Sequence, residues 1–286
     1  VVMRLLAQNT DRLRLDAIGM PAPILARLRK ALAATSGLVL VTGPTGSGKT
    51  TTLYAALSEI NTPETKIITV EDPVEYRLPG VIQVQVHEKI DLSFARVLRS
   101  CLRQDPDVVL VGEMRDQETA EIGLRAALTG HLVLSTLHTN DAAGAAMRLG
   151  DMGIPPYMVA LGLRLVIAQR LVRQICDQCK QPHTLEPHEL EWLHLELGER
   201  AGEHAFFRGA GCQHCHNAGY RGRAGVYEMM EMTPELVHAA NTADHASFTR
   251  IAREQFKEFT LRHASVRLAL AGRTTVAEAM RVSNQS

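Results

Sequence analysis

Aromatic rings, net charge and long apolar runs are all scarce in this sequence of 286 residues. Phe, Trp and Tyr make up only 4% of it, and 31 acidic residues balance 31 basic ones. Proteins that bind nucleic acid need stacking platforms and a positive surface field, so both features argue against such a partner. No apolar run approaches the roughly 20 residues of a membrane-spanning helix. With 45% apolar residues, the composition is that of an ordinary globular protein.

Cysteine is sparse as well, but four of the five cysteines form two Cys-x-x-Cys pairs. In a reducing cytoplasmic compartment, such pairs indicate a metal rather than disulfides. Two pairs in one chain are typical of a tetrahedral structural Zn²⁺ site in which four thiolates complete the coordination shell. A redox-active dithiol is the alternative for either pair alone, whereas both pairs together favour zinc. The predicted ligands are Cys176, Cys179, Cys212 and Cys215.

Short apolar runs alternate with helical patterns through the first half of the chain. Predicted strands lie at 38–41, 66–70, 81–86, 108–111 and 131–137, and predicted helices at 21–35, 50–60, 94–103 and 119–128. This alternation predicts an α/β fold with a parallel sheet and helices on both faces. Beyond about residue 145 we expect mainly helix, broken by a Cys- and His-rich loop region at 176–225.

A glycine-rich loop follows the first predicted strand and opens a helix, with the sequence GPTGSGKT at 43–50. In this arrangement backbone N–H groups wrap phosphates at a helix N-terminus. Lys49 is expected to reach the β- and γ-phosphates of a nucleoside triphosphate, and Thr50 to bind the accompanying Mg²⁺. The residues expected to contact the nucleotide are Gly43, Pro44, Thr45, Gly46, Ser47, Gly48, Lys49, Thr50 and Thr51.

Carboxylates follow two of the predicted strands. Glu113 comes just after 108–111, at the end of a parallel strand where ligands bind, so it is the predicted contact for Mg²⁺ and its waters. Glu71, Asp72 and Glu75 follow the strand at 66–70, and such a cluster can contain a general base for attack by water. For each acid alone, a helix cap or a solvated turn is an equal alternative.

Two histidines, His131 and His138, bracket the strand at 131–137. A polar group comes together near its end, where it could sense a γ-phosphate: Ser135, Thr136, His138, Thr139 and Asn140. The pattern alone does not separate this role from a structural hydrogen bond.

Four blocks in this order resemble the ATPases of type II secretion and type IV pilus assembly, and the resemblance covers nearly the whole chain. GPTGSGKT resembles their Walker A motif and ITVEDPVEY at 68–76 their aspartate box. LRSCLRQDPDVVLVGEMRDQETA at 98–120 is similar to their Walker B block, and TGHLVLSTLHTNDA at 129–142 to their histidine box. Assembly ATPases also carry a tetracysteine zinc segment that pilus-retraction relatives lack, and the resemblance implies that residues 187–197 form a helix within it.

The resemblance implies specific roles. Glu75 matches the general base, and Glu113 matches the carboxylate that orients Mg²⁺. His131 and His138 match residues near the γ-phosphate and the subunit interface. It also implies a RecA-like core that forms a homohexamer, peripheral to the inner membrane on its cytoplasmic side, where it pushes on a membrane platform protein to assemble a pilus or pseudopilus.

The same resemblance predicts how the chain is divided. Residues 1–10 would end a preceding N-terminal domain, 11–170 form the ATPase core, 171–226 the zinc-binding subdomain and 227–286 a helical C-terminal region. In the family the N-terminal domain supplies arginines to the phosphates. Because only its end is expected here, we predict that the chain binds nucleotide but hydrolyses it slowly.

Two other function classes remain at this stage. One is a RecA-like nucleic-acid motor with a zinc module that contacts DNA, against which the neutral charge counts. The other is a nucleotide-binding regulator without turnover.

Overall fold

The computed structural model describes residues 13–242, 244–256 and 259–283. Its centre is a seven-stranded sheet in the order β3-β2-β4-β5-β1-β6-β9, in which every neighbouring pair is parallel except β6 and β9. The strands are β1 (Gly37–Thr42), β2 (Ile67–Glu71), β3 (Ile82–Gln85), β4 (Val108–Val111), β5 (Leu132–Leu137), β6 (Leu163–Ile175) and β9 (Tyr220–Glu231). The five strands predicted in the first half of the chain are confirmed as β1 to β5.

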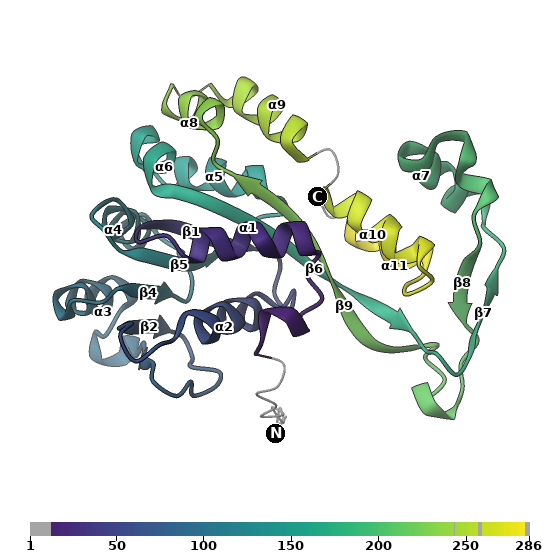
Figure 1. Ribbon diagram of the computed structural model, residues 1–286, viewed down its shortest axis with the longest axis horizontal. Coiled ribbons are helices and arrows are strands. Elements are labelled where there is room, and N and C mark those ends of the chain that lie inside the picture. Colours follow the sequence, from purple (N-terminus) through teal and green to yellow (C-terminus); the bar gives the residue numbers. More distant parts are fainter. Residues whose placement is uncertain (1–12, 243, 257–258, 284–286) are drawn as a thin grey trace.

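Helices cover both faces of this sheet, as predicted for an α/β fold (Figure 1). Alternate residues of the central strand explain the two layers: Val39 and Val41 pack on one side, Leu38 and Leu40 on the other. The first side is covered by α1 (Ala22–Leu32) and α2 (Lys49–Ile60). The second is covered by α3 (Phe94–Cys101), α4 (Gln117–Leu128), α5 (Ala142–Asp151), α6 (Pro156–Gly162), α8 (Pro234–Asn241) and α9 (His245–Phe256).

Helices predominate beyond residue 145, as predicted, but two long strands in this region were not predicted. β6 and β9 are long strands that pair antiparallel from Leu165–Glu231 to Ile175–Tyr220. Arg, Gln, Leu and Ala in β6 have high helix propensity, but pairing with β1 on one side and β9 on the other outweighs it. The predicted boundaries at 170/171 and 226/227 fall inside these two strands, so the division into three parts stays a prediction.

An arm extends from the far ends of β6 and β9 (Figure 1). It contains the two-stranded sheet of β7 (Lys180–His183) and β8 (Phe206–Gly209), together with α7 (Pro187–Leu197), which confirms the helix predicted at 187–197. The arm packs on α10 (Leu261–Leu270) and α11 (Val276–Ser283) through an apolar cluster that contains Trp192, Leu193 and Val266. The helical C-terminal region therefore supports the arm.

Short 3₁₀ turns complete the described chain. They are η2 (Leu15–Ala17), η3 (Glu88–Ile90), η4 (Leu102–Gln104), η5 (Gly198–Glu203) and η6 (Gln213–Cys215). In the part of the chain that the structure describes, no helix combines the length and apolar character needed to cross a bilayer. The domain end expected at 1–10 lies outside the described residues.

Candidate functional site

The glycine-rich loop lies between the end of β1 and the start of α2, as predicted. Gly43, Gly46 and Gly48 all have positive φ angles, of 148°, 81° and 91°. At Gly43 a side chain is excluded by space as well, because a Cβ would lie 2.4 Å from the carbonyl oxygen of Gln169. The loop therefore depends on its glycines, and α2 begins directly behind it with free N–H groups available to an anion.

Lys49 lies in the first turn of α2 and points back along the loop. Its Nζ donates hydrogen bonds to the carbonyl oxygens of Gly43 at 2.8 Å and Pro44 at 3.1 Å. Burial lowers the pKa of Lys49, an effect that Glu113 opposes and Arg170 reinforces. Thr50 is exposed beside it, and Thr51 is half-buried. An ammonium whose hydrogen bonds to the described residues all go to loop carbonyls can move to a phosphate at little cost.

Glu113 follows β4 and is held firmly by the neighbouring strands. The preceding Gly112 N–H donates to Val70 O at 2.8 Å, and the following Met114 N–H donates to Thr136 O at 3.1 Å. The carboxylate is only 14% exposed. It lies 2.5 Å from Arg115 Nη2 and 3.6 Å from His138 Nε2. The predicted Mg²⁺ contact thus lies at the edge of the sheet that carries the glycine-rich loop.

His138 follows β5 at the same edge. Burial lowers its pKa, the nearby charge of Lys49 lowers it further, and Glu113 opposes both effects. At neutral pH the ring is therefore uncharged, and its Nε2 faces the Glu113 carboxylate. Lys49, Glu113 and His138 form one electrostatically coupled group, which we call the catalytic cluster after the catalytic roles predicted for Lys49 and Glu113.

His131 does not join this cluster. It precedes β5, whose first residue Leu132 pairs with Gly37 at the start of β1. The glycine-rich loop follows the other end of β1, so a strand of six residues, roughly 17 Å long, separates His131 from it. The ring of His131 faces the carbonyl oxygen of Ala126, with Nδ1 at 3.1 Å. Its role at a subunit interface stays a prediction.

The acids after β2 have different environments. Glu71 is buried; Tyr54, Thr69 and Gln83 donate hydrogen bonds to its carboxylate. Glu75 is exposed, and its side chain makes no hydrogen bond or ion pair with other described residues. Glu71 therefore has a structural environment, whereas Glu75 is open to water as a general base needs to be.

Three residues near the loop were missed from the sequence. Arg115 is paired with Glu113 and lies only two positions after it, so the charge pattern could have identified it. Gln169 and Arg170 lie beneath the loop on β6. Their position could not be found because β6 was expected to be helical.

The four cysteines meet between the arm and the ends of β6 and β9. Their Sγ atoms all lie within 4.8 Å of one another, and the closest pairs are 3.7, 3.8 and 3.9 Å apart. A tetrahedral site with Zn–S bonds of about 2.3 Å requires sulfur separations of about 3.8 Å. This set is the one group of possible metal ligands among the described residues.

The backbone around the cysteines suits thiolates. N–H groups of Gly211, Cys212 and Gly219 donate to sulfur at 3.3 Å. Although burial opposes it, donation from the Cys212 and Gly219 N–H groups lowers the pKa of Cys215 to about 6. A Cβ on Gly209 would lie 1.9 Å from the Gly219 carbonyl oxygen, so only glycine allows β8 to approach the second cysteine loop. The donor set fits Zn²⁺.

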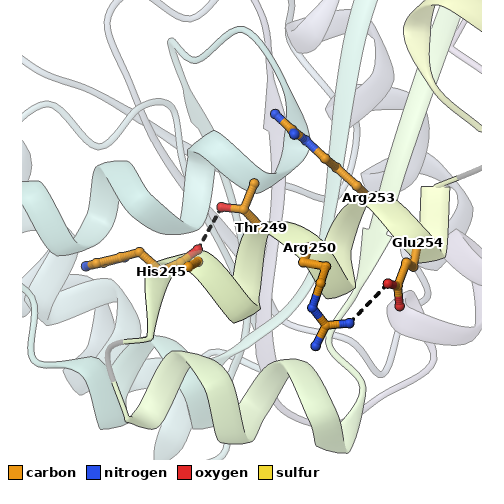
Figure 2. Close-up of a pocket in the computed structure, with 6 residues that line it drawn as sticks. His245, Thr249, Arg250, Arg253 and Glu254 are labelled. Atoms are coloured by element: carbon orange, nitrogen blue, oxygen red, sulfur yellow. Dashed lines mark hydrogen bonds and ion pairs between the residues drawn. The ribbon is translucent and has the colours of Figure 1, made fainter.

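A surface hollow of about 610 Å³ lies elsewhere, along α9 (Figure 2). Figure 2 shows Arg250 directed at Glu254, with 3.0 Å between Nη1 and Oε1, and Thr249 donating to the carbonyl oxygen of His245. None of its lining residues belongs to the catalytic cluster or the cysteine set. It is therefore separate from the glycine-rich loop and its neighbours.

Comparison with known proteins gives close relatives. The family profile described as "Type II/IV secretion system protein" matches residues 1–281. The "Putative type II secretion system protein E" of Escherichia coli (strain K12) is 47% identical over 284 residues, or 99% of this chain and 57% of that protein. The "Type IV pilus assembly ATPase PilB" of Myxococcus xanthus (strain DK1622) is 45% identical over 282 residues, or 97% and 49%. The chain thus spans about half the length of these relatives.

Among solved structures, the pilus retraction motor PilT with bound ADP aligns with a TM-score of 0.68 and 30% identity, over 94% of this chain and 66% of that one. With the cysteine set and the C-terminal helices, this likeness confirms the predicted RecA-like fold class. The predicted resemblance to type II secretion and type IV pilus proteins is also confirmed. The chain belongs to the type II/IV secretion system protein family.

Proposed function

We propose that this chain binds Mg²⁺-ATP at the glycine-rich loop and hydrolyses it. Loop N–H groups and Lys49 would hold the phosphates, while Thr50 and Glu113 would hold Mg²⁺ and its waters. Glu75 would accept the proton of the attacking water, and His138 would contact the γ-phosphate. The observation that carries this proposal is the catalytic cluster, in which Lys49, Glu113 and the neutral His138 share one edge of the parallel sheet.

Zn²⁺ would be purely structural. With four thiolates around it, the metal has no open position for a substrate. It would connect the β7–β8 arm to the ends of β6 and β9.

The work done with ATP would be the assembly of a type IV or mannose-sensitive-type pilus, or of a type II secretion pseudopilus. The chain would act as part of a homohexamer in the cytoplasm, peripheral to the inner membrane, with the membrane platform protein as its partner. Similarity to a type II secretion protein E and to a pilus assembly ATPase supports this class of machine. The two relatives are similar to the chain to nearly the same degree, so neither machine is favoured over the other.

Phosphate release and binding of a fluorescent ATP analogue, measured on the same variants, test the proposal. Glu113→Gln and Glu75→Gln should bind nucleotide but lose most turnover. Lys49→Ala should weaken binding by about ten- to a hundredfold, the loss expected for a charge-assisted hydrogen bond. Glu64→Gln, at an exposed acid outside the site, is the matched control.

Failure of the wild type to bind Mg²⁺-ATP would contradict the nucleotide site. Binding with unchanged turnover in Glu75→Gln would instead indicate a different base or a regulator that does not need hydrolysis.

A further inference from the structure

A buried arginine lies directly beneath the glycine-rich loop. Arg170, on β6, is 2% exposed. Its Nη2 donates to the Asn140 carbonyl oxygen at 2.6 Å and its Nη1 to the Gln169 carbonyl oxygen at 3.1 Å. Burial lowers the pKa of Arg170, which shows that the surroundings disfavour its charge. A buried cation held mainly by carbonyl oxygens is costly, so its position needs a reason.

Arg170 contacts the loop at its first glycine. A Cβ built on Gly43 would lie 3.1 Å from Arg170 Nη1 and 2.7 Å from Ser47 Oγ. Both side chains therefore approach Gly43 at the same point. Among the described residues, the buried side-chain atoms without a hydrogen-bond partner are Ser47 Oγ, Arg170 Nε and Trp192 Nε1. Two of these three lie at the floor of the loop.

The other end of the guanidinium reaches the segment after β5. Asn140, whose carbonyl oxygen accepts from Arg170, lies two residues beyond His138 of the catalytic cluster. One side chain thus contacts the floor of the phosphate-binding loop and the end of the histidine segment. The relative position of these two segments determines how far His138 lies from a phosphate bound in the loop.

A buried acid, Glu228 on β9, balances Arg170. In the antiparallel register Ala168 pairs with Glu228 and Arg170 with Val226, so the side chains of Arg170 and Glu228 are diagonal neighbours on one face. The Glu228 carboxylate accepts hydrogen bonds from the N–H groups of Ala142 at 2.9 Å and Leu261 at 3.3 Å. These amides begin α5 and α10, so one carboxylate stabilises two helix N-termini.

We propose that Arg170 is a positioning residue for ATP turnover, which keeps the phosphate-binding loop and the histidine segment in register. Through Glu228 it also connects the nucleotide site to α10, the helix that supports the zinc-binding arm. This inference rests on the proposed function. The spare hydrogen-bonding capacity of Ser47 Oγ and Arg170 Nε gives the floor of the loop two groups that can form new bonds when phosphates draw the loop closer.

Kinetics separate positioning from simple structural support. Arg170→Lys keeps a positive charge near Glu228, but a lysine cannot donate to the Gln169 and Asn140 carbonyl oxygens with the planar fork of a guanidinium. We expect kcat to fall by about ten- to a hundredfold, as for a small misplacement of reacting groups, with nucleotide Kd within about threefold of the wild type. Arg173→Lys is the matched control, because Arg173 lies on the opposite face of β6 and pairs with Glu278. Wild-type kcat in Arg170→Lys, or equal losses in kcat and affinity, would overturn the proposal.

Hydrogen exchange on the wild-type protein is a second test that no folding defect can obscure. Mg²⁺-ADP should slow exchange at loop residues 43–50 and also at the Ala142 and Leu261 amides that donate to Glu228. Protection of the loop without protection of those two amides would overturn the connection while leaving nucleotide binding intact. No protection anywhere would overturn the proposed function together with this inference.

Discussion

The buried carboxylate of Glu71 shows how similar acids at one strand end acquire different roles. Glu71 is the last residue of β2, and its side chain points into the layer of α2, where Tyr54 donates to it. Burial and this hydrogen bond raise the pKa of Tyr54, so its hydroxyl remains a donor at every physiological pH. Glu75, four residues further on, is exposed. Sequence order alone did not separate the two acids.

Tyr54→Phe tests the structural role of Glu71. The change removes one donor to a buried acid, so we expect the free energy of unfolding to fall by about 1.5–3 kcal/mol, the range for a hydrogen bond to a charged group. Urea denaturation gives the measurement. Tyr157→Phe, at a ring that is 52% exposed, is the control and should change little. Equal stability of both variants would show that Glu71 does not depend on Tyr54.

At the catalytic cluster, part of the geometry could be predicted from the sequence. Lys49, Glu113 and His138 each follow a parallel strand, and the carboxyl ends of parallel strands share one edge. The same rule places His131 at the opposite edge, because it precedes its strand. Arg170 could not be predicted, since its role depends on pairing between β6, β1 and β9 over long sequence distances.

At the scale of elements, β6 and β9 show where sequence patterns were insufficient. β1, β2, β4 and β5 are short and fully buried because helices cover both faces, whereas the edge strand β3 is partly exposed. β6 instead continues beyond its pairing with β1, and in this part charged residues such as Arg173 lie among its apolar ones. This mixture lacks the alternation that indicates a strand, and only its antiparallel partner determines the conformation.

Glu278 connects β6 to α11 and should make this junction sensitive to acid. Although burial alone would raise its pKa, hydrogen bonds from Arg281 and Arg173 lower the pKa of Glu278 to about 2. The folded-state pKa is below the ordinary value of 4.5, so the stabilisation is present above about pH 4.5 and is lost as the pH falls towards 2.

The test compares the free energy of unfolding of the wild type and Glu278→Gln as a function of pH. The difference should be largest near neutral pH and should shrink steadily below pH 4.5. Glu254→Gln, which removes an exposed pair with Arg250, should show almost no pH-dependent difference. A Glu278→Gln difference that stays constant down to pH 3 would contradict the expected ionisation.

The arm of β7, β8 and α7 is an element whose stability should depend on the zinc proposed for the four cysteines. We expect about one zinc ion per chain by elemental analysis, and almost none in Cys179→Ser, because three thiolates leave the tetrahedral shell incomplete. Hydrogen exchange in β7 and β8 should then accelerate, while the seven-stranded sheet stays protected.

Cys101→Ser is the matched control, since Cys101 is buried in α3 away from the other four cysteines. It should retain its zinc. Full zinc content in Cys179→Ser would show that the four cysteines do not form the metal site.

For the whole molecule, the balance of 31 basic and 31 acidic residues distinguishes a secretion or pilus motor from a nucleic-acid motor. A nucleic-acid motor gains affinity when its basic residues neutralise DNA phosphates. For each phosphate contact, the logarithm of the association constant falls by about 0.9 for each tenfold rise in salt concentration. A chain without charge excess should bind duplex DNA with a Kd above about 10⁻⁴ M at physiological salt. This affinity is weaker than the usual range for non-specific binding. Duplex DNA should therefore leave ATP turnover unchanged.

Fluorescence anisotropy with labelled DNA across a salt series checks this prediction, with ATP turnover measured in the same buffers. The fold does not decide the outcome, because RecA-like cores occur in motors of both kinds. The surface charge decides whether the chain binds DNA, since it determines whether counterions are released on binding. Micromolar DNA affinity with a steep salt slope, together with faster turnover, would favour the nucleic-acid motor over the secretion and pilus machinery.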